Sequence, residues 1–347
     1  MKKKIAIFGS TGSIGKCLID IIKKDQKNFE IVLLSADENY KELLKQAKFF
    51  KVKNLIITNP KSFYKIKQDK YSKKTKIFNN FDELGKIFKK KIDYTMCSIS
   101  GIQGLKPTIE IIRFTKKIAI ANKEAIICGW DLIEKRLKKH KTEFVPVDSE
   151  HFSIWYALKG AQNSLIDKIY LTASGGPFLG KSKKKLEKAN INQAINHPNW
   201  KMGKKISIDS ATMINKVFEV IEAKKIFKIP YNKLSILIHP KSYVHALIKF
   251  KNGLTKIIVH DTNMKIPIFN SLYSSNNVVN SNDLDFKILN HLDFRNVNFK
   301  EFPLVRLLKI LPADTSLFET ILVSINDKFV ELFLNNKIKF TDISKKM

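Results

Sequence analysis

The chain has 347 residues, of which 44% are hydrophobic, and a formal net charge of +31. This length predicts two or three domains, and the lack of an apolar run of about 18 residues excludes a membrane-spanning helix, so we expect no membrane partner. The positive charge is almost all lysine, with only four arginines. Because base readout and bidentate phosphate contacts favour arginine, we expect no nucleic-acid partner either.

The N-terminus leads directly into an apolar strand at residues 5–8. This run is too short for the hydrophobic region of a signal peptide, and we therefore expect a cytoplasmic protein. Cys17, Cys97 and Cys128 show no C-x-x-C spacing and leave an odd number, which fits a reducing compartment.

The first half of the chain alternates short apolar strands with amphipathic helices. Repeated units of this length predict an α/β fold, a parallel, doubly wound, Rossmann-like sheet over residues 1–148. The expected strands are 5–8, 31–34, 54–58, 94–98, 117–121 and 143–147, and the expected helices are 13–24, 40–50, 81–88, 105–113 and 123–139.

A glycine-rich turn joins the first strand to the first helix, with Gly9, Gly12 and Gly15 at a spacing of three. Glycines here let the backbone approach a pyrophosphate, and the helix that follows points its N-terminal amides at it. The spacing is G-x-x-G-x-x-G, whereas G-x-G-x-x-G is commoner. Its position between a strand and a helix predicts a dinucleotide-binding site.

Two acids, Asp37 and Glu38, follow the second strand. A carboxylate at this place hydrogen-bonds a ribose 2′-hydroxyl and repels a 2′-phosphate, which from the residues alone favours NAD. The alternative is that both acids face solvent at the start of the next helix, where they favour its dipole.

An acidic cluster with a histidine, at residues 147–151, stands out in this basic chain. If the preceding strand continues, Asp148 and Glu150 are two residues apart and point to the same side. Two carboxylates that face one way repel each other unless a cation lies between them, and a divalent metal is the usual one. The alternative is an exposed loop in which both carboxylates meet water.

After residue 149 the pattern changes. A strand expected at 169–172 leads into a Ser-Gly-Gly-Pro turn, and a polar, lysine-rich stretch over 180–196 ends in His197-Pro-Asn-Trp-Lys-Met-Gly203. A long, weakly hydrophobic segment that holds one tryptophan is typical of a lid over a site. Regular structure is expected again at 206–208.

A helix predicted over residues 210–225 carries two stripes. One is apolar. The second stripe is polar and consists of Thr212, Asn215, Lys216 and Glu219 at helical spacing. This polar face either meets solvent or lines a pocket, in which case Glu219 is the candidate third metal ligand.

Beyond this helix we expect strands at 235–238, 244–250 and 254–260, with a turn at Asn252-Gly253. His239 and His245 lie in this sheet and are expected to be structural. A Ser/Asn-rich stretch opens a predicted linker over 274–301, and amphipathic helices are expected at 302–311 and 317–334.

Taken in order, six motifs make the chain resemble the 1-deoxy-D-xylulose 5-phosphate reductoisomerase family over roughly residues 1–345. Pro-Val-Asp-Ser-Glu-His at 146–151 and His-Pro-Asn-Trp-x-Met-Gly at 197–203 are the most specific. The six are residues 9–15, 121–124, 147–151, 174–178, 197–203 and 205–219.

The resemblance implies a homodimer that uses NADPH and a divalent metal, Mn²⁺ or Mg²⁺, the ions that suit hard oxygen ligands. It implies an NADP-binding domain over 1–148, a catalytic domain over 149–273 with a lid at about 174–204, the linker, and a C-terminal helical domain over 302–347. That last domain is shorter than is usual in the family, so we expect an exposed helix face unless a dimer covers it.

By motif position the resemblance also implies the site residues. The metal ligands are Asp148, Glu150 and Glu219, which together with Lys123 are the catalytic residues. The substrate-binding residues are Lys123, Ser149, Glu150, Ser174, His197, Trp200, Met202, Ser210, Asn215, Lys216 and Glu219. The cofactor-binding residues are Thr11, Gly12, Ser13, Ile14, Asn39, Asn122, Glu124 and Gly203.

The implied reaction is a metal-dependent skeletal rearrangement of 1-deoxy-D-xylulose 5-phosphate followed by reduction with NADPH, which gives 2-C-methyl-D-erythritol 4-phosphate for isoprenoid synthesis. Asp37 and Glu38 depart from the glycine and basic residue usual in the family, and we predict unusually good use of NADH. Two alternatives stay open. One is a decayed reductoisomerase or a basic binding module without turnover, and the other is a different dehydrogenase that shares only the glycine loop.

Overall fold

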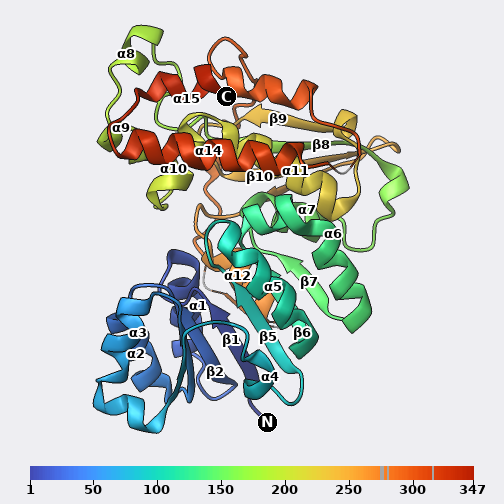
Figure 1. Cartoon of the computed structure of the whole chain (residues 1–347). Coiled ribbons are helices and arrows are strands. Elements are labelled where there is room, and N and C mark those ends of the chain that lie inside the picture. Colours follow the sequence, from blue (N-terminus) through green and yellow to red (C-terminus); the bar gives the residue numbers. More distant parts are fainter. Residues whose placement is uncertain (274–276, 280, 315) are drawn as a thin grey trace. The chain divides into compact units, whose positions relative to one another are not determined.

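The computed structural model describes residues 1–273, 277–279, 281–314 and 316–347. The chain forms two compact units, Met1–Asp148 with Met264–Val279, and Ser149–Asn263 with Asn280–Met347 (Figure 1). None of the helices in the described part is long and apolar enough to cross a membrane.

The first unit is built on a seven-stranded sheet in which every neighbouring pair is parallel, in the order β4-β3-β2-β1-β5-β6-β7. Its chain order reverses between β1 and β5, the place where such sheets bind nucleotides. The doubly wound α/β fold is therefore confirmed. The strands are β1 (Lys3–Phe8), β2 (Phe29–Ala36), β3 (Asn54–Ile57), β4 (Lys76–Phe78), β5 (Ile92–Cys97), β6 (Thr115–Ile120) and β7 (Glu143–Pro146).

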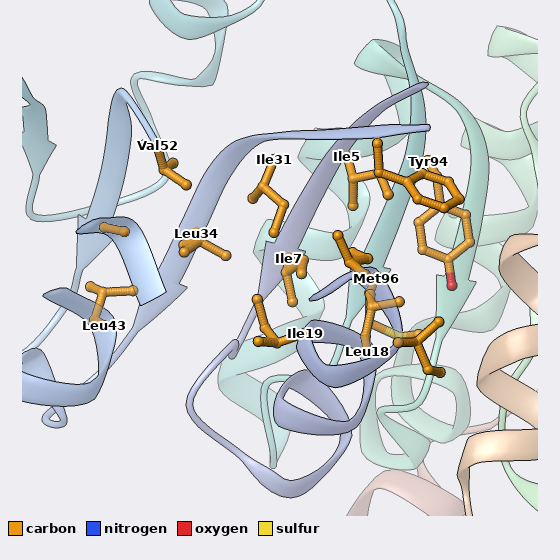
Figure 2. Close-up of a cluster of buried hydrophobic side chains, with 14 of the residues drawn as sticks. Ile5, Ile7, Leu18, Ile19, Ile31, Leu34, Leu43, Val52, Tyr94 and Met96 are labelled. Atoms are coloured by element: carbon orange, nitrogen blue, oxygen red, sulfur yellow. The ribbon is translucent and has the colours of Figure 1, made fainter. Parts of the chain in front are cut away.

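The helices of this unit bury one apolar face against the sheet. Ile5 and Ile7 of β1 pack with Leu18 and Ile19 of α1 in the core (Figure 2). The structure adds α3 and β4 to the predicted elements and shortens the helix predicted at 81–88. The helices are α1 (Ser13–Lys23), α2 (Tyr40–Phe50), α3 (Pro60–Lys67), α4 (Leu84–Ile87), α5 (Leu105–Ile111), α6 (Lys123–His140) and α12 (Lys265–Leu272).

Helix α12 belongs to the first unit, although the sequence analysis assigned residues up to 273 to the catalytic domain. Ile268, Phe269 and Leu272 join the core of the first unit. The Ser271 hydroxyl lies 2.7 Å from the buried Tyr94 hydroxyl. The helix therefore returns to the N-terminal sheet because its apolar face and its buried hydroxyl both find partners there.

The second unit has a five-stranded mixed sheet in the order β11-β10-β8-β9-β12. Only β8 and β9 run parallel. Part of the predicted linker, β12, is a strand of this sheet, whereas residues 274–276 and 280 of that linker lie outside the described residues. The strands are β8 (Ile166–Ala173), β9 (Leu234–Ile238), β10 (Val244–Phe250), β11 (Thr255–Val259) and β12 (Arg295–Asn296).

Helices pack around this second sheet. The segment predicted as an amphipathic helix at 302–311 is a 3-10 helix at Pro303–Lys309, and α15 was not predicted. The α-helices are α7 (Ser149–Ala157), α8 (Lys183–Glu187), α9 (Ile191–Ile195), α10 (Lys204–Ala211), α11 (Ile214–Phe227), α13 (Phe286–Leu289), α14 (Phe318–Leu334) and α15 (Phe340–Lys346).

The single helix predicted at 210–225 is wrong, because the chain breaks between α10 and α11. Met213 adopts a left-handed conformation with a φ of 64° and precedes α11. Its side chain is buried, and burial of an apolar side chain outweighs the roughly 1–2 kcal/mol cost of that conformation. Neither glycine nor proline marks this break in the sequence.

Helix α14 buries one face and exposes another. Its buried face includes Asn326, whose side-chain amide donates to Asp209 Oδ1 of α10 at 2.8 Å. Its other face presents Ile321 and Ile325 to solvent, with Leu317 just before the helix.

Candidate functional site

The glycine loop of the first unit has the shape that a dinucleotide requires. Gly9 has a φ of +76°, and a Cβ there would lie 2.7 Å from the Ser98 carbonyl oxygen. A Cβ at Gly15 would lie 2.4 Å from the Gly9 carbonyl oxygen. The loop can therefore close against the start of α1 only with glycine at these positions, and the residues present fit a bound pyrophosphate.

The predicted cofactor residues Thr11, Gly12, Ser13 and Ile14 lie at the start of α1, where Gly12 is the N-cap. Gly12 and Ser13 are exposed, and Thr11 and Ile14 are half-buried. The backbone amides of this first turn point outward from the helix, as anion binding requires.

Hydrogen bonds join this loop to the end of β2. The Gly9 amide donates to Ser35 Oγ at 3.0 Å, and the Ser10 amide donates to the Ser35 carbonyl at 2.8 Å. From α2, the Gln46 side-chain amide donates to the Ser10 carbonyl at 3.0 Å. Sequence reasoning missed Ser35 and Gln46, because each acts on a loop far away in the chain.

The acids after β2 have separate surroundings. Asp37 Oδ1 accepts a 2.6 Å hydrogen bond from the Thr58 hydroxyl. Asn39 is the N-cap of α2 and accepts from the Glu42 amide at 3.1 Å. The cap of α2 is thus Asn39, a predicted cofactor residue, and neither acid is needed for that purpose.

The segment after β6 holds three more predicted residues, all buried: Asn122, Lys123 and Glu124. Asn122 caps α6 by accepting from the Ala125 amide, and its own amide donates to the Gly101 and Ile99 carbonyls. Lys123 Nζ donates to Asp148 Oδ2 at 3.2 Å. Asn122 therefore holds the loop after β5 against α6, and Lys123 provides a positive charge for Asp148.

The acidic cluster is not in a strand, so the geometric premise for Asp148 and Glu150 was wrong. β7 ends at Pro146, and α7 begins at Ser149, which places Glu150 in the first helical turn. Asp148 lies between the two elements and immediately precedes the first residue of α7. One oxygen of Asp148, Glu150 and Glu219 lies within 4.8 Å of the others, which is the grouping that the sequence analysis predicted.

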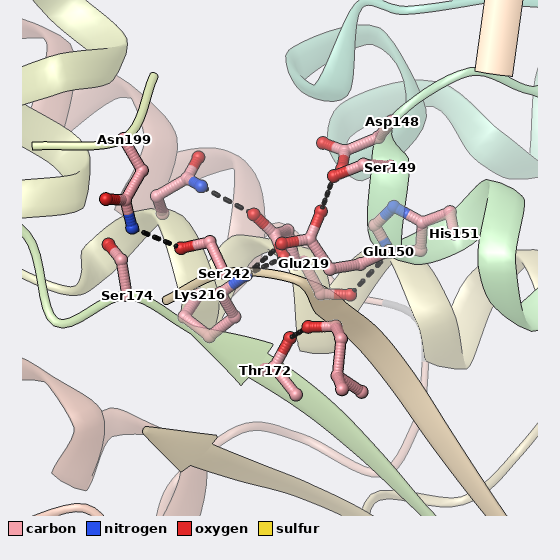
Figure 3. A network of polar contacts seen from close by, with 12 residues as sticks. Asp148, Ser149, Glu150, His151, Thr172, Ser174, Asn199, Lys216, Glu219 and Ser242 are labelled. Carbon is pink, nitrogen blue, oxygen red and sulfur yellow. Dashed lines mark hydrogen bonds and ion pairs between the residues drawn. The ribbon is translucent and has the colours of Figure 1, made fainter. Parts of the chain in front are cut away.

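Helix α11 brings the opposite charge (Figure 3). Lys216 Nζ lies 2.6 Å from Glu150 Oε1 and 2.6 Å from Glu219 Oε2. The Asn215 amide donates to the other oxygen of Glu219, and the Ser149 hydroxyl to the other oxygen of Glu150, each at 2.5 Å. The polar face of α11 is therefore turned toward Glu150 and is largely withdrawn from solvent, with Lys216 and Glu219 buried and Asn215 half-buried.

This charge arrangement shows what the carboxylates can hold. Burial alone would lower the pKa of Lys216, but Glu150 and Glu219 raise it above its ordinary value, so the ammonium stays charged. Two carboxylates this close need positive charge between them. Together with Asp148 they offer hard oxygen ligands, so the residues present fit Mg²⁺ or Mn²⁺.

Behind the cluster lies a buried histidine and glutamate pair. His151 Nε2 is 2.8 Å from the Glu219 carbonyl oxygen, and its Nδ1 is 3.9 Å from Glu222 Oε2. The side chains of His151 and Glu222 are each 1% exposed. His151 therefore joins α7 to α11 directly behind the two glutamates. Sequence reasoning missed Glu222, although its place one helical turn after Glu219 could have indicated it.

Ser174 and His197 are brought together. Ser174 Oγ lies 2.9 Å from His197 Nε2. His197 Nδ1 accepts from the amides of Asn199 and Trp200, which assigns the proton to Nε2. Burial, reinforced by the charge of Lys216, lowers the pKa of His197 to about 4.

The turn that follows Ser174 packs on the end of α10, which carries Ser210. A Cβ added to Gly176, two residues after Ser174, would lie 3.0 Å from the Ser210 carbonyl oxygen at the end of α10. The turn thus packs on the helix that ends one residue after Ser210. The structure therefore brings Gly176 against Ser210, although the two residues are far apart in the sequence.

The predicted lid contains two short helices, α8 and α9, that the sequence analysis did not predict. Trp200 packs edge-on against His245, with ring centroids 6.0 Å apart. Met202 is half-buried, and Gly203 is the exposed N-cap of α10. His245 Nε2 bonds the His260 carbonyl, as expected for a structural histidine.

Comparisons with known proteins identify one family. Three family models match the chain: 1-deoxy-D-xylulose 5-phosphate reductoisomerase over residues 5–129, its C-terminal domain over 144–227, and the DXP reductoisomerase C-terminal domain over 260–347. The 1-deoxy-D-xylulose 5-phosphate reductoisomerase of Pelagibacter ubique (strain HTCC1062) is 61% identical over 99% of this chain and 89% of its own length.

Solved structures agree. The reductoisomerase from Zymomonas mobilis in complex with NADPH superposes with a TM-score of 0.89 at 32% identity, covering 99% of this chain and 90% of that one. A DOX-P reductoisomerase in complex with NADPH, fosmidomycin and magnesium gives a TM-score of 0.91 at 33% identity, with 99% and 87% covered.

Proposed function

This chain belongs to the 1-deoxy-D-xylulose 5-phosphate reductoisomerase family, and we propose that Asp148, Glu150 and Glu219 form its metal and substrate centre. It is an NADP-dependent oxidoreductase and isomerase that converts 1-deoxy-D-xylulose 5-phosphate to 2-C-methyl-D-erythritol 4-phosphate. NADPH and a divalent metal are its cofactors.

The observation that carries this proposal is the contact of one buried ammonium with two carboxylates, that of the buried Glu219 and that of the half-buried Glu150. Lys216 lies 2.6 Å from both Glu150 and Glu219, and its own side chain is 6% exposed. Buried charges of this density are costly and are typical of catalytic sites. Asp148, with Lys123 at 3.2 Å, adds a third carboxylate.

Each side chain of this centre has a proposed part. When bound, a divalent ion supplies Lewis-acid stabilisation of negative charge on the ketone and hydroxyl oxygens of the substrate. Asp148, Glu150 and Glu219 would hold it. Lys123 and the Ser149 hydroxyl orient the substrate oxygens, and Asn215 keeps the Glu219 carboxylate in place through its 2.5 Å hydrogen bond.

A phosphate pocket is proposed from Ser174, Ser210, Asn215 and Lys216. Hydroxyl and amide donors beside an ammonium suit a phosphate dianion. His197 donates from Nε2 to Ser174 in this structure and is neutral at pH 7, so it can donate to a substrate oxygen instead. Trp200 and Met202 would cover the pocket and exclude water.

For the cofactor, we propose the loop at Thr11, Gly12, Ser13 and Ile14 for the pyrophosphate. Asn39, Asn122, Glu124 and Gly203 are proposed as further contacts. The two glycines that tolerate no Cβ support this assignment, because they let the loop pack closely against the start of α1, whose first amides would bind the pyrophosphate.

The chain is further proposed to form a homodimer in the cytoplasm. β11 is the outer strand of its sheet; Ile257 on it is 45% exposed, and Leu254 just before it is 65% exposed. An exposed apolar edge strand of this kind pairs readily with a second copy. The cytoplasmic location is supported by three free cysteines, Cys17, Cys97 and Cys128.

One assay tests the whole proposal. Oxidation of NADPH is followed with 1-deoxy-D-xylulose 5-phosphate, with and without Mn²⁺, in the wild type and in Glu219→Gln. We expect metal-dependent turnover that falls by at least about a thousandfold in the variant, because a metal ligand and its charge are lost. Absence of turnover in the wild type at saturating Mn²⁺ would mean a decayed enzyme or a binding module.

A further inference from the structure

We propose that Asp37, fixed in place by Thr58, makes the ribose end of the cofactor site accept NADH about as well as NADPH. The inference rests on the proposed dinucleotide site and specifies its selectivity. It concerns only residues of the first unit.

Asp37 lies at the position where such folds bind the adenosine ribose of a dinucleotide. It directly follows β2, the neighbour of β1 in the sheet. The end of β2 is joined to the glycine loop through Ser35, which bonds the amides of Gly9 and Ser10. An acid at the end of the second strand of such a sheet accepts hydrogen bonds from the ribose hydroxyls.

The carboxylate is held rigidly. Thr58 donates its hydroxyl to Asp37 Oδ1 at 2.6 Å, and the Thr58 amide donates to the Ala36 carbonyl at 3.2 Å. The Asn59 amide donates to the Asp37 carbonyl at 3.4 Å. Because Thr58 binds Oδ1, the side chain loses less conformational freedom when Oδ2 accepts a hydrogen bond from a ligand.

The carboxylate is also not neutralised. Within the described ranges, neither Asp37 nor Glu38 has an ion-pair partner within 4.0 Å. The helix cap is provided by Asn39, so neither acid caps α2. Glu38 takes part only through its carbonyl, which accepts from the Ser62 hydroxyl at 2.8 Å. Asp37 is therefore the acid that the structure positions, and Glu38 adds charge.

This arrangement acts oppositely on the two cofactors. NADPH differs from NADH by a 2′-phosphate, which a carboxylate repels, whereas a free 2′-hydroxyl donates to the same carboxylate. NADPH is still expected to bind through the contacts that it shares with NADH, while its 2′-phosphate no longer adds affinity.

The test is direct binding, measured separately from turnover. Dissociation constants for NADH and NADPH are determined by fluorescence titration of the full chain, for the wild type, Asp37→Asn, Thr58→Val and Glu30→Gln. Glu30 is exposed on β2 at the opposite end of the strand, so its variant makes the same charge change away from the site.

In the wild type we expect the two dissociation constants to agree within about tenfold. Asp37→Asn should shift the ratio toward NADPH by about tenfold or more, Thr58→Val should shift it the same way by less, and Glu30→Gln should leave it unchanged. A wild-type preference for NADPH of a hundredfold or more, or a ratio that Asp37→Asn does not move, overturns the inference. Failure of the folded protein to bind either nucleotide would instead overturn the proposed cofactor site.

Discussion

At the scale of single residues, the ammonium group of Lys216 is involved in two different interactions. In this structure it balances Glu150 and Glu219, whereas the proposed function also assigns it to the substrate phosphate. The ammonium cannot stay 2.6 Å from both carboxylates when a divalent ion takes its place, since like charges repel. Metal binding and release of Lys216 toward the phosphate are therefore expected to be coupled.

Replacing Lys216 with methionine tests this coupling. Lys216→Met should raise the affinity for Mn²⁺ by about tenfold, because two carboxylates are left without their cation, and should abolish substrate binding. Mn²⁺ binding is measured by electron paramagnetic resonance. Lys225→Met, on the same helix and outside the cluster, is the matched control. An unchanged or weaker affinity for Mn²⁺ would contradict the coupling.

His197 is expected to stay neutral far below neutral pH. Its pKa is lowered to about 4 by burial and by Lys216, against an ordinary value of 6.5. The unfolded chain therefore binds more protons between pH 6.5 and 4, and the contribution of this histidine to folding is lost as the pH falls through that window. Nitrogen-15 NMR of the imidazole should show a proton on Nε2 at pH 7, and titration near pH 6.5 would contradict the expectation.

At the scale of elements, the site depends on how α7 and α11 are held together. His151 of α7 bonds the Glu219 carbonyl of α11, directly beside the glutamates that each helix supplies. A residue of this kind orients metal ligands without touching the metal, and its loss typically costs ten- to a hundredfold in metal affinity.

His151→Phe is predicted to raise the dissociation constant for Mn²⁺ by roughly tenfold, because the ring volume is kept but the hydrogen bond is lost. Calorimetric titration gives the affinity, and circular dichroism verifies the fold. His239→Phe makes the same change just after β9, where His239 bonds the Asp293 carbonyl, and should leave the affinity for Mn²⁺ unaltered. Equal losses in both variants would mean that the effect is one of general stability.

At the scale of the whole molecule, the outer strand β11 is the proposed surface for a second copy. Ile257→Lys places a charge on this exposed edge, and we predict that it shifts the protein from dimer to monomer in light scattering after gel filtration. Ile321→Lys, on the exposed face of α14, is the comparison. A dimer that persists in Ile257→Lys but dissociates in Ile321→Lys would move the proposed interface to α14.

Much of this molecule could be predicted from local patterns. Residues close together in the chain determine three of its features: the alternation of strands and helices, the glycine loop, and the polar stripe at Asn215, Lys216 and Glu219. Periodicity of 2.0 or 3.6 residues follows from backbone geometry and needs no tertiary contact. The grouping of Asp148, Glu150 and Glu219 was also predicted, although the strand assumed for the first two is a helix.

By itself, the sequence determined the class of fold and the family, and it predicted the residues that are proposed to carry the chemistry, because these depend on side-chain types at fixed spacings. Only the tertiary structure decided the break at Met213, the return of α12 to the first sheet, the His151 link behind the glutamates and the bond from Thr58 to Asp37. Each of these depends on burial or on a partner distant in the chain, and neither leaves a periodic signal in the residues nearby.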